Sequence, residues 1–263
     1  MEPLDRFLAR RLALPIREVR RRIQWGRVAV DGQRCQRYHL KLPPGTAVAM
    51  DGAEVADGPD VSVLVLHKPR GLACSHDAEE GPLIYDLVPP AWRHPDLHSC
   101  GRLDRDTTGL LLLTSDGQVT RRLMDPGRRV AKRYLVEHTG ELPADATQRV
   151  AAGMTLVDDP RPLLPARLEV SGPGRCAIEL HEGRHHQVKR MIRDLGSRVT
   201  ALHRERIGSL DLPADLAPGA IRPATRAELR AAGCELPWWA GAEEQPAPGT
   251  HGQIQDENGA GQP

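Results

Sequence analysis

Residues 101–117 read Gly-Arg-Leu-Asp-Arg-Asp-Thr-Thr-Gly-Leu-Leu-Leu-Leu-Thr-Ser-Asp-Gly, and the segments around them are best interpreted from this stretch. The first half is polar, charged and bounded by glycines, which predicts a loop. The second half contains the apolar run Leu110–Leu113, closed by an Asp-Gly turn, which is typical of a buried strand. The stretch therefore predicts two loop carboxylates, Asp104 and Asp106, at the end of a rigid strand, where reactive groups are often carried.

The pattern Gly-Arg-Leu-Asp-x-x-Thr-Thr-Gly-Leu, which begins at Gly101, resembles the signature of RNA pseudouridine synthases. The resemblance is to the branch that modifies ribosomal RNA at single sites, and it implies that Asp104 is the catalytic carboxylate. Whether Asp104 attacks the base or the ribose stays open. Asp106 is the rival carboxylate, but the family pattern leaves its position freer, so we expect a supporting or solvated role.

Two later segments resemble the second and third motifs of the same family. Lys-x-Tyr-x-Val implies that Tyr134 packs against the target base, and Gly-Arg-x-His-Gln-Val-Lys implies that Lys189 pairs with Asp104. A core tyrosine and a solvated helix charge are the alternative interpretations. The chain has only eight aromatic residues and four lysines against 32 arginines, so neither residue type is its default choice. Arg102 would hold the position of the target base, which is flipped out of the RNA, or a neighbouring phosphate.

The third motif also contains candidate RNA contacts. Arg184 and His186 precede a predicted helix with apolar residues at helical spacing and a stop at Gly196. The start of such a helix suits an anion. His185 lies next to His186, but adjacent helical residues point apart, so RNA contact or a structural role is preferred to metal binding.

Composition excludes several classes of protein. The 263 residues are 40% apolar and contain no run of eighteen apolar residues, so a globular chain of one or two domains without a membrane span is expected. No apolar signal-peptide core follows Met1, and a cytoplasmic location is expected. The five cysteines are scattered, which predicts reduced thiols rather than disulfides or a zinc site. No phosphate-loop or dinucleotide motif is present, so no cofactor and no metal is expected.

The near-neutral net charge of +1 hides a basic head. Residues 1–41 hold eleven Arg or Lys against four Asp or Glu. Helices are predicted over 3–13 and from Pro15 to Gly26, followed by a strand at 28–30 that enters a hairpin turn. Two short helices followed by Trp-Gly-Arg-Val and Val-Asp-Gly resemble the S4-type RNA-binding module. The predicted RNA contacts are four arginines that neutralise phosphates: Arg17, Arg20, Arg21 and Arg27.

Further helices and strands are predicted from the spacing of apolar residues and from the Gly and Pro residues that end each element. Strands are predicted at 61–66, 130–137, 154–157, 166–170 and 175–181, and helices at 118–124, 144–152, 188–195 and 225–233, the last begun by a capping box. The segment Leu202–Gly208, which contains the further RNA-contact candidate Arg204, resembles the small-subunit (16S) rRNA branch more than the large-subunit branches. Beyond Glu235 the chain is rich in Pro, Gly, Gln and acid, and a disordered tail is expected.

Together these patterns predict an α+β protein with an S4-like head at 1–50, a linker at 51–60, a pseudouridine synthase domain at 61–233 with a largely antiparallel or mixed sheet flanked by helices, and a tail at 234–263. The resemblance implies cofactor-free isomerisation of one uridine in 16S rRNA, free or in an assembling small subunit, by a monomer. The alternatives are the same chemistry on 23S rRNA and, in another class, a non-catalytic rRNA-binding assembly factor.

Overall fold

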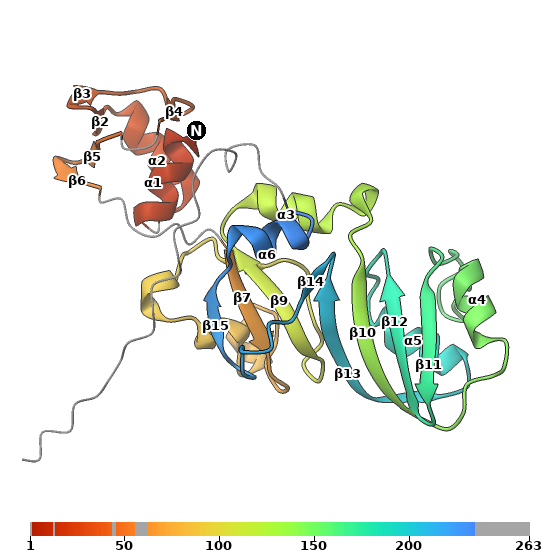
Figure 1. Cartoon of the computed structure of the whole chain (residues 1–263). Helices are drawn as coiled ribbons and strands as arrows, with labels where there is room; N and C mark the ends of the chain where they lie inside the picture. The colour runs from red at the N-terminus through yellow and green to blue at the C-terminus, as the bar shows by residue number, and fades with distance from the viewer. Residues whose placement is uncertain (1, 13, 44–45, 56–62, 235–263) are drawn as a thin grey trace, which may run out of the picture.

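The computed structural model describes residues 2–12, 14–43, 46–55 and 63–234. These residues form a small head of helices and short strands, and a larger domain built on one wide sheet (Figure 1). The predicted α+β class is therefore confirmed. The predicted strand at 61–66 begins inside the described part at Val63, and the expected tail lies outside it except for Cys234.

The head packs two helices against short strands. Helices α1 and α2 span Leu4–Leu12 and Ile16–Gln24. Its strands are β1 Glu2–Pro3, β2 Val28–Val30, β3 Gln33–Arg34, β4 Lys41–Leu42, β5 Val48–Met50 and β6 Ala53–Glu54. Strand β1 pairs with β4, and the other four form a sheet in the order β3-β2-β5-β6. Pro3 is thus in a strand rather than in the first helical turn.

The head extends beyond the predicted boundary at residue 50. Strand β6 pairs with β5, and Val55 is buried in the same apolar cluster as Leu4 and Ile23. The first five residues of the predicted linker therefore belong to the head. The Asp-Gly turn at 51–52 explains the error, because a polar hairpin turn and the start of a linker have the same composition.

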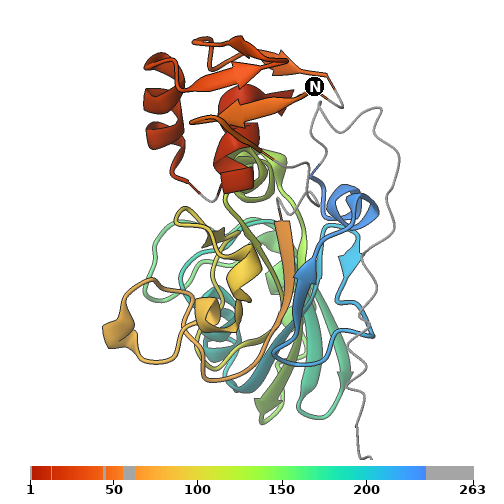
Figure 2. The ribbon, with the colours of Figure 1, turned by 90° about the vertical axis from the view of Figure 1, so that its left-hand side faces the viewer.

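The head lies against one end of the sheet domain (Figure 2), and polar contacts between described residues join the two. The Arg6 guanidinium lies 2.7 Å from a carboxylate oxygen of Asp116, the N-cap residue of helix α3 (Gly117–Met124). The His94 Nε2 lies 2.8 Å from the carbonyl oxygen of Ala9 in α1. Because the backbone N–H of Asp96 donates to Nδ1 of the same ring, Nε2 carries the proton and donates.

The large sheet has nine strands. Seven follow the order β11-β12-β10-β13-β9-β7-β15, while β14 pairs with β13 and β8 with β9. Only the β9–β13 ladder is parallel, so the sheet is largely antiparallel, as predicted. The strands are β7 Val63–Lys68, β8 His98–Ser99, β9 Thr108–Thr114, β10 Lys132–Thr139, β11 Arg167–Gly172, β12 Arg175–Leu180, β13 Arg198–Ile207, β14 Leu210–Asp211 and β15 Ile221–Pro223.

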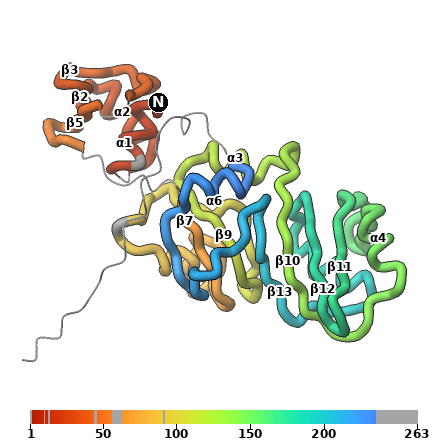
Figure 3. Tube along the Cα trace, in the orientation of Figure 1, coloured from red at the N-terminus to blue at the C-terminus, as the bar shows by residue number. Residues whose placement is uncertain are grey.

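Strand β9 is buried on both faces, which explains its unbroken run of leucines. Leu110 and Leu112 pack in a cluster with residues of α3 and α6 (Arg226–Ala231), two helices that lie side by side (Figure 3). Leu111 and Leu113 pack on the other face in a cluster with residues of the segment between β7 and β8. Each of the four is fully buried, and each contributes roughly 1.5–3 kcal/mol of hydrophobic stabilisation.

The other half of the sheet is covered on one face by α4 (Ala146–Ala152) and α5 (Gln187–Asp194). Val136 of β10 and Leu202 of β13 join Val188 of α5 in one apolar cluster. The alternate residues of β10 point to the opposite face, where Leu135 is 44% exposed. The predicted helices and strands of this half match the structure within about two residues, the usual uncertainty of element ends.

One predicted element is wrong. Residues 154–157 form no strand, and only an isolated bridge joins Leu156 to Asp159. Met154 and Leu156 are buried in the cluster beneath the sheet, while Val157 is 88% exposed. The alternating pattern that indicated a strand therefore comes from a loop that packs every second side chain.

Gly109 allows the two halves of the sheet to meet. It pairs with Arg204 across the parallel β9–β13 ladder and has a φ of +112°. A Cβ atom built on Gly109 would lie 2.2 Å from the backbone oxygen of Arg204. Both the close approach and the left-handed φ favour glycine at this position.

We predict that Gly109→Ala lowers the free energy of unfolding of the sheet domain by about 2 kcal/mol or more, because the clash involves backbone and cannot relax by side-chain rotation. Equilibrium urea denaturation followed by circular dichroism would measure the change. Gly117→Ala is the matched control, since a Cβ there meets no atom within 4 Å and Ala favours the α3 helix. Equal stability of the two variants would contradict the account of the β9–β13 junction.

Candidate active site

The loop at residues 101–107 meets the start of α5. Lys189 of α5 places its Nζ 2.8 Å from Asp104 Oδ2 and 2.7 Å from Asp106 Oδ1. Asp104 is held by the rigid strand that follows it, and the backbone N–H of Thr107 donates to its carbonyl oxygen. The structure thus gathers two carboxylates and one ammonium group from segments far apart in the chain.

Both members of the Lys189–Asp106 pair have shifted pKa values. Burial on its own lowers the pKa of Lys189, but hydrogen bonds and attraction from Asp104 and Asp106 outweigh it and raise the pKa. Burial opposes ionisation of Asp106, yet the hydrogen bond from Lys189 leaves its pKa below the usual value. At neutral pH the lysine is therefore a cation and Asp106 an anion, so Asp106 is an ion-pair partner rather than a merely solvated carboxylate.

His186 lies at this site. Its Nε2 is 3.3 Å from Asp104 Oδ1, and its ring stacks on His185 with 3.7 Å between the centroids. The two side chains do not point apart, because His186 is the N-cap of α5 with a left-handed φ of 50° and so precedes the helix. His186 was predicted as an RNA contact, and the structure places it against the carboxylate of Asp104.

Lys68 supports the loop at residues 101–107 from inside the protein. Its side chain is fully buried at the end of β7 and donates to the carbonyl oxygens of Thr107 (2.9 Å), Pro69 (3.1 Å) and Arg105 (3.3 Å). Burial lowers the pKa of Lys68 from its ordinary value. The sequence offered one signal for this residue, since it is one of only four lysines and precedes Pro-Arg-Gly in a turn.

Tyr134 lies in β10 between the two halves of the domain. Its partly buried side chain packs against the cluster that contains Val188 and against the cluster that contains Leu103. These residues directly precede Lys189 and Asp104 in sequence. The ring therefore packs near both sides of the site, although the structure alone is equally compatible with a core tyrosine.

Comparison with known proteins agrees with this geometry. The family described as RNA pseudouridylate synthase matches residues 62–194, and the S4 domain family matches residues 2–48. The chain is 40% identical to ribosomal small subunit pseudouridine synthase A of Escherichia coli (strain K12), over 86% of this chain and 97% of that one. It is 41% identical to the protein of the same name in Pseudomonas aeruginosa, over 86% and 98%. The structure described as "Crystal structure of pseudouridylate synthase" aligns with a TM-score of 0.61 at 32% identity, over 88% of this chain and 100% of that one.

The chain belongs to the RNA pseudouridine synthase family. Its head is an S4 domain, so both resemblances predicted from the sequence are confirmed. The synthase is thus an enzyme whose family signature coincides with the Asp104 loop. No helix among the described residues is long and apolar enough to cross a membrane. Within the same residues, no group of three or more His, Cys, Asp or Glu side chains is placed to hold a metal ion.

Arg102 of the synthase is an exposed residue of the loop at residues 101–107. Within the described part of the chain, its guanidinium makes no hydrogen bond or ion pair. It is therefore available for an anion, as its predicted role requires. The geometry leaves that role a prediction.

Two predicted RNA contacts of the sheet domain have structural partners instead. Arg204 is 2% exposed, and its Nε donates to the carbonyl oxygen of Leu110, so it is not available for RNA and the prediction is wrong. The charge of Arg204 suggested an exposed side chain. The residue is buried because it pairs with Gly109 in the β9–β13 ladder. Arg184 donates to Asp159 and to the carbonyl oxygens of Arg161 and Pro162, and so ties a loop in place.

The head arginines divide into two kinds. Arg20 lies 2.7 Å from the buried carboxylate of Asp5, and Arg27 forms an ion pair with Asp51, so both have protein partners. Arg17 and Arg21 are exposed and form no ion pair among the described residues, although Arg21 lies over the ring of Trp25 at 5.1 Å. Arg17 and Arg21 are the better candidates for phosphate contacts.

We predict that Lys68→Met lowers the free energy of unfolding by about 1–3 kcal/mol, because buried carbonyl oxygens lose their donor. Hydrogen exchange of residues 101–107, measured by mass spectrometry, should accelerate by about tenfold as the loop opens locally. Lys132→Met is the matched control, since that buried lysine donates to Val130 and touches no part of the loop. Unchanged exchange in Lys68→Met would show that the ammonium group does not hold the loop.

Proposed function

We propose that this synthase isomerises one uridine of 16S rRNA to pseudouridine, with Asp104 as the catalytic carboxylate. The observation that carries the proposal is the ion pair between Asp104 and Lys189, at the two positions that match the family motifs. The small-subunit target is supported by the names of the relatives, which are at least 40% identical over nearly their whole length. The substrate is the free rRNA or an assembling small subunit.

The reaction rearranges bonds without adding or removing atoms. The bond between ribose C1′ and N1 of uracil breaks, the base turns, and C1′ bonds to C5. The proton lost from C5 is balanced by one gained at N1. No cofactor is needed for this chemistry. The uridine is first flipped out of its stack, at a cost of a few kcal/mol that the contacts with the enzyme offset.

Each residue of the site takes a part in this proposal. Asp104 acts on the base or on the ribose carbon, and Lys189 forms the ion pair that orients the carboxylate. Tyr134 stacks on the flipped base. Arg102, whose guanidinium has no partner among the described residues, holds the position that the flipped base has left or an adjacent phosphate. Asp106 shares Lys189 and supports the arrangement without touching the reacting atoms.

We predict that Asp104→Asn lowers the isomerisation rate by about 10³-fold or more, whereas RNA affinity is retained, because the chemistry loses its carboxylate while the fold keeps its shape. Pseudouridines would be mapped on unmodified 16S and 23S rRNA and on partly assembled subunits by carbodiimide-induced reverse-transcription stops. Asp106→Asn is the matched control and should keep the rate within about tenfold.

The pattern of stops separates the possible functions. One new stop in 16S rRNA, lost in Asp104→Asn, is the expected result. A stop only in 23S rRNA would keep the chemistry and contradict the small-subunit target. Tight rRNA binding without any stop would favour the non-catalytic assembly factor. Turnover by Asp104→Asn at the wild-type rate would remove Asp104 from the mechanism.

We also predict that Arg17→Gln/Arg21→Gln weakens rRNA binding and its salt dependence. Two lost phosphate contacts should reduce the slope of log affinity against log salt by about 1.4–1.8, depending on whether the contacts are to single or double strands. Filter binding at several salt concentrations measures the slope. Arg167→Gln, on the far edge strand β11 and paired with Glu169, is the control for removal of surface charge. An unchanged slope in the double variant would exclude α2 as the RNA-binding surface.

A further inference from the structure

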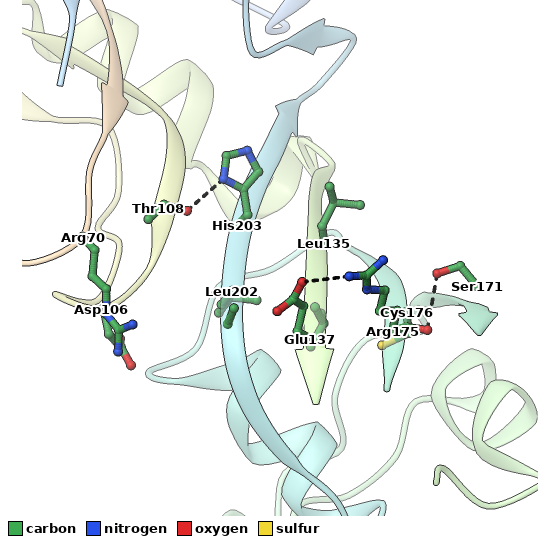
Figure 4. Close-up of a pocket in the computed structure, with 12 residues that line it drawn as sticks. Arg70, Asp106, Thr108, Leu135, Glu137, Ser171, Arg175, Cys176, Leu202 and His203 are labelled. Atoms are coloured by element: carbon green, nitrogen blue, oxygen red, sulfur yellow. Dashed lines mark hydrogen bonds and ion pairs between the residues drawn. The ribbon is translucent and has the colours of Figure 1, made fainter. Parts of the chain in front are cut away.

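A groove of about 510 Å³ crosses the face of the sheet opposite α5 (Figure 4). Arg70 and Asp106 lie at one end of it, and Arg175 and Ser171 lie at the other, on β12 and β11. Leu135 lines the groove between these ends. Because Asp106 also binds Lys189, the groove begins at the active site.

Arg70 is, like Arg102, an arginine at the loop of residues 101–107, and its positive charge attracts Asp106 without a direct ion pair. It is exposed, and within the described residues its guanidinium makes no ion pair or hydrogen bond. Apart from Arg102, the neighbouring cations have protein partners: Lys189 binds the carboxylates, Lys68 and Arg105 donate to backbone carbonyls, and Arg204 is buried against Leu110.

The backbone holds Arg70 at a fixed place beside the loop. The N–H of Gly71 donates to the carbonyl oxygen of Arg105 at 2.7 Å, and the buried Lys68 side chain donates to the same oxygen. Lys68 also pairs with Gly109 in the β7–β9 ladder. The turn that carries Arg70 therefore moves with the loop that carries Asp104, so little backbone ordering is needed to bring the guanidinium to a ligand at the site.

Arg70 contributes to the local charge balance. Asp104 and Asp106 outnumber Lys189, which leaves the carboxylate cluster itself with a net negative charge. Arg70 and Arg102 reverse the balance, as binding of a polyanion at this place requires. A planar guanidinium can also donate two parallel N–H bonds to two oxygens of one phosphate, which an ammonium group cannot do.

We propose that Arg70 binds a phosphate of the rRNA backbone next to the target uridine and directs the strand that continues from it into the groove. The inference rests on the proposed function, because it takes the flipped uridine at Asp104 as its starting point. A strand leaving that nucleotide carries a phosphate at its first step, beside the fixed loop. Arg70 is thus an RNA-binding residue that positions the substrate, with no part in the bond changes.

The test compares Arg70→Gln and Arg70→Lys with wild type and with Arg167→Gln. Affinity for 16S rRNA is measured by filter binding between low and moderate salt, and pseudouridine formation is measured at saturating enzyme. Arg70→Gln should reduce the slope of log affinity against log salt by about 0.7, the value for one phosphate contact on a single strand. Its single-turnover rate at saturation should stay within about twofold of wild type, since the binding is uniform in ground and transition states.

Arg70→Lys should keep the wild-type salt slope, since it retains the charge, and Arg167→Gln should also keep it. A wild-type slope in Arg70→Gln would overturn the proposal, as would a lowered rate at saturation with unchanged affinity. The salt slope is read from binding alone. Failure of the proposed function, seen as no pseudouridine formed by wild type on any rRNA, is therefore distinguished from failure of the Arg70 contact.

Discussion

The Lys189 ammonium group between Asp104 and Asp106 joins the two halves of the sheet domain at the active site. The lysine comes from α5, which packs beneath β10 and β13, while both carboxylates come from the loop before β9. The three side chains are 25%, 28% and 52% exposed, so the pairs add at most about 1 kcal/mol each to stability. Their importance lies in geometry, because they fix a charged carboxylate at the one place where α5 meets the loop.

Buried cations stabilise this geometry by donating hydrogen bonds to backbone carbonyl oxygens around the site. Lys68 donates to carbonyl oxygens of the loop, and Arg204 donates to Leu110 where the parallel β9–β13 ladder forms. Gly109 lets these strands approach closely enough to pair. Arg102 and Arg70, which make no ion pair or hydrogen bond within the described part of the chain, lie exposed at the same loop. The buried cations thus hold the backbone of the site in place, and the exposed cations are available to bind phosphates.

Features that depend on a local sequence pattern could be predicted, whereas contacts between distant segments could not. The leucine run predicts β9, and helical spacing predicts α5, since both patterns are local. The contact between Asp104 and Lys189, which lie in distant segments of the chain, is indicated only by the family motifs, because no local pattern brings a loop residue and a helix residue together. The second contact of Lys189, with Asp106, was not predicted. Arg204 and Arg184 were misjudged for a physical reason. From sequence alone, a charged residue is expected at the surface. Here each arginine instead donates to a carbonyl oxygen from a distant segment, which the sequence does not reveal.

Parallel measurement of rRNA affinity and single-turnover isomerisation in Lys189→Met tests the central claim, that this lysine serves the chemistry by holding Asp104. The account predicts a rate at least about 100-fold below wild type with affinity within about twofold, because the interaction acts on the reacting carboxylate and not on the RNA backbone. A wild-type rate in this variant would contradict the account, and so would a loss confined to affinity.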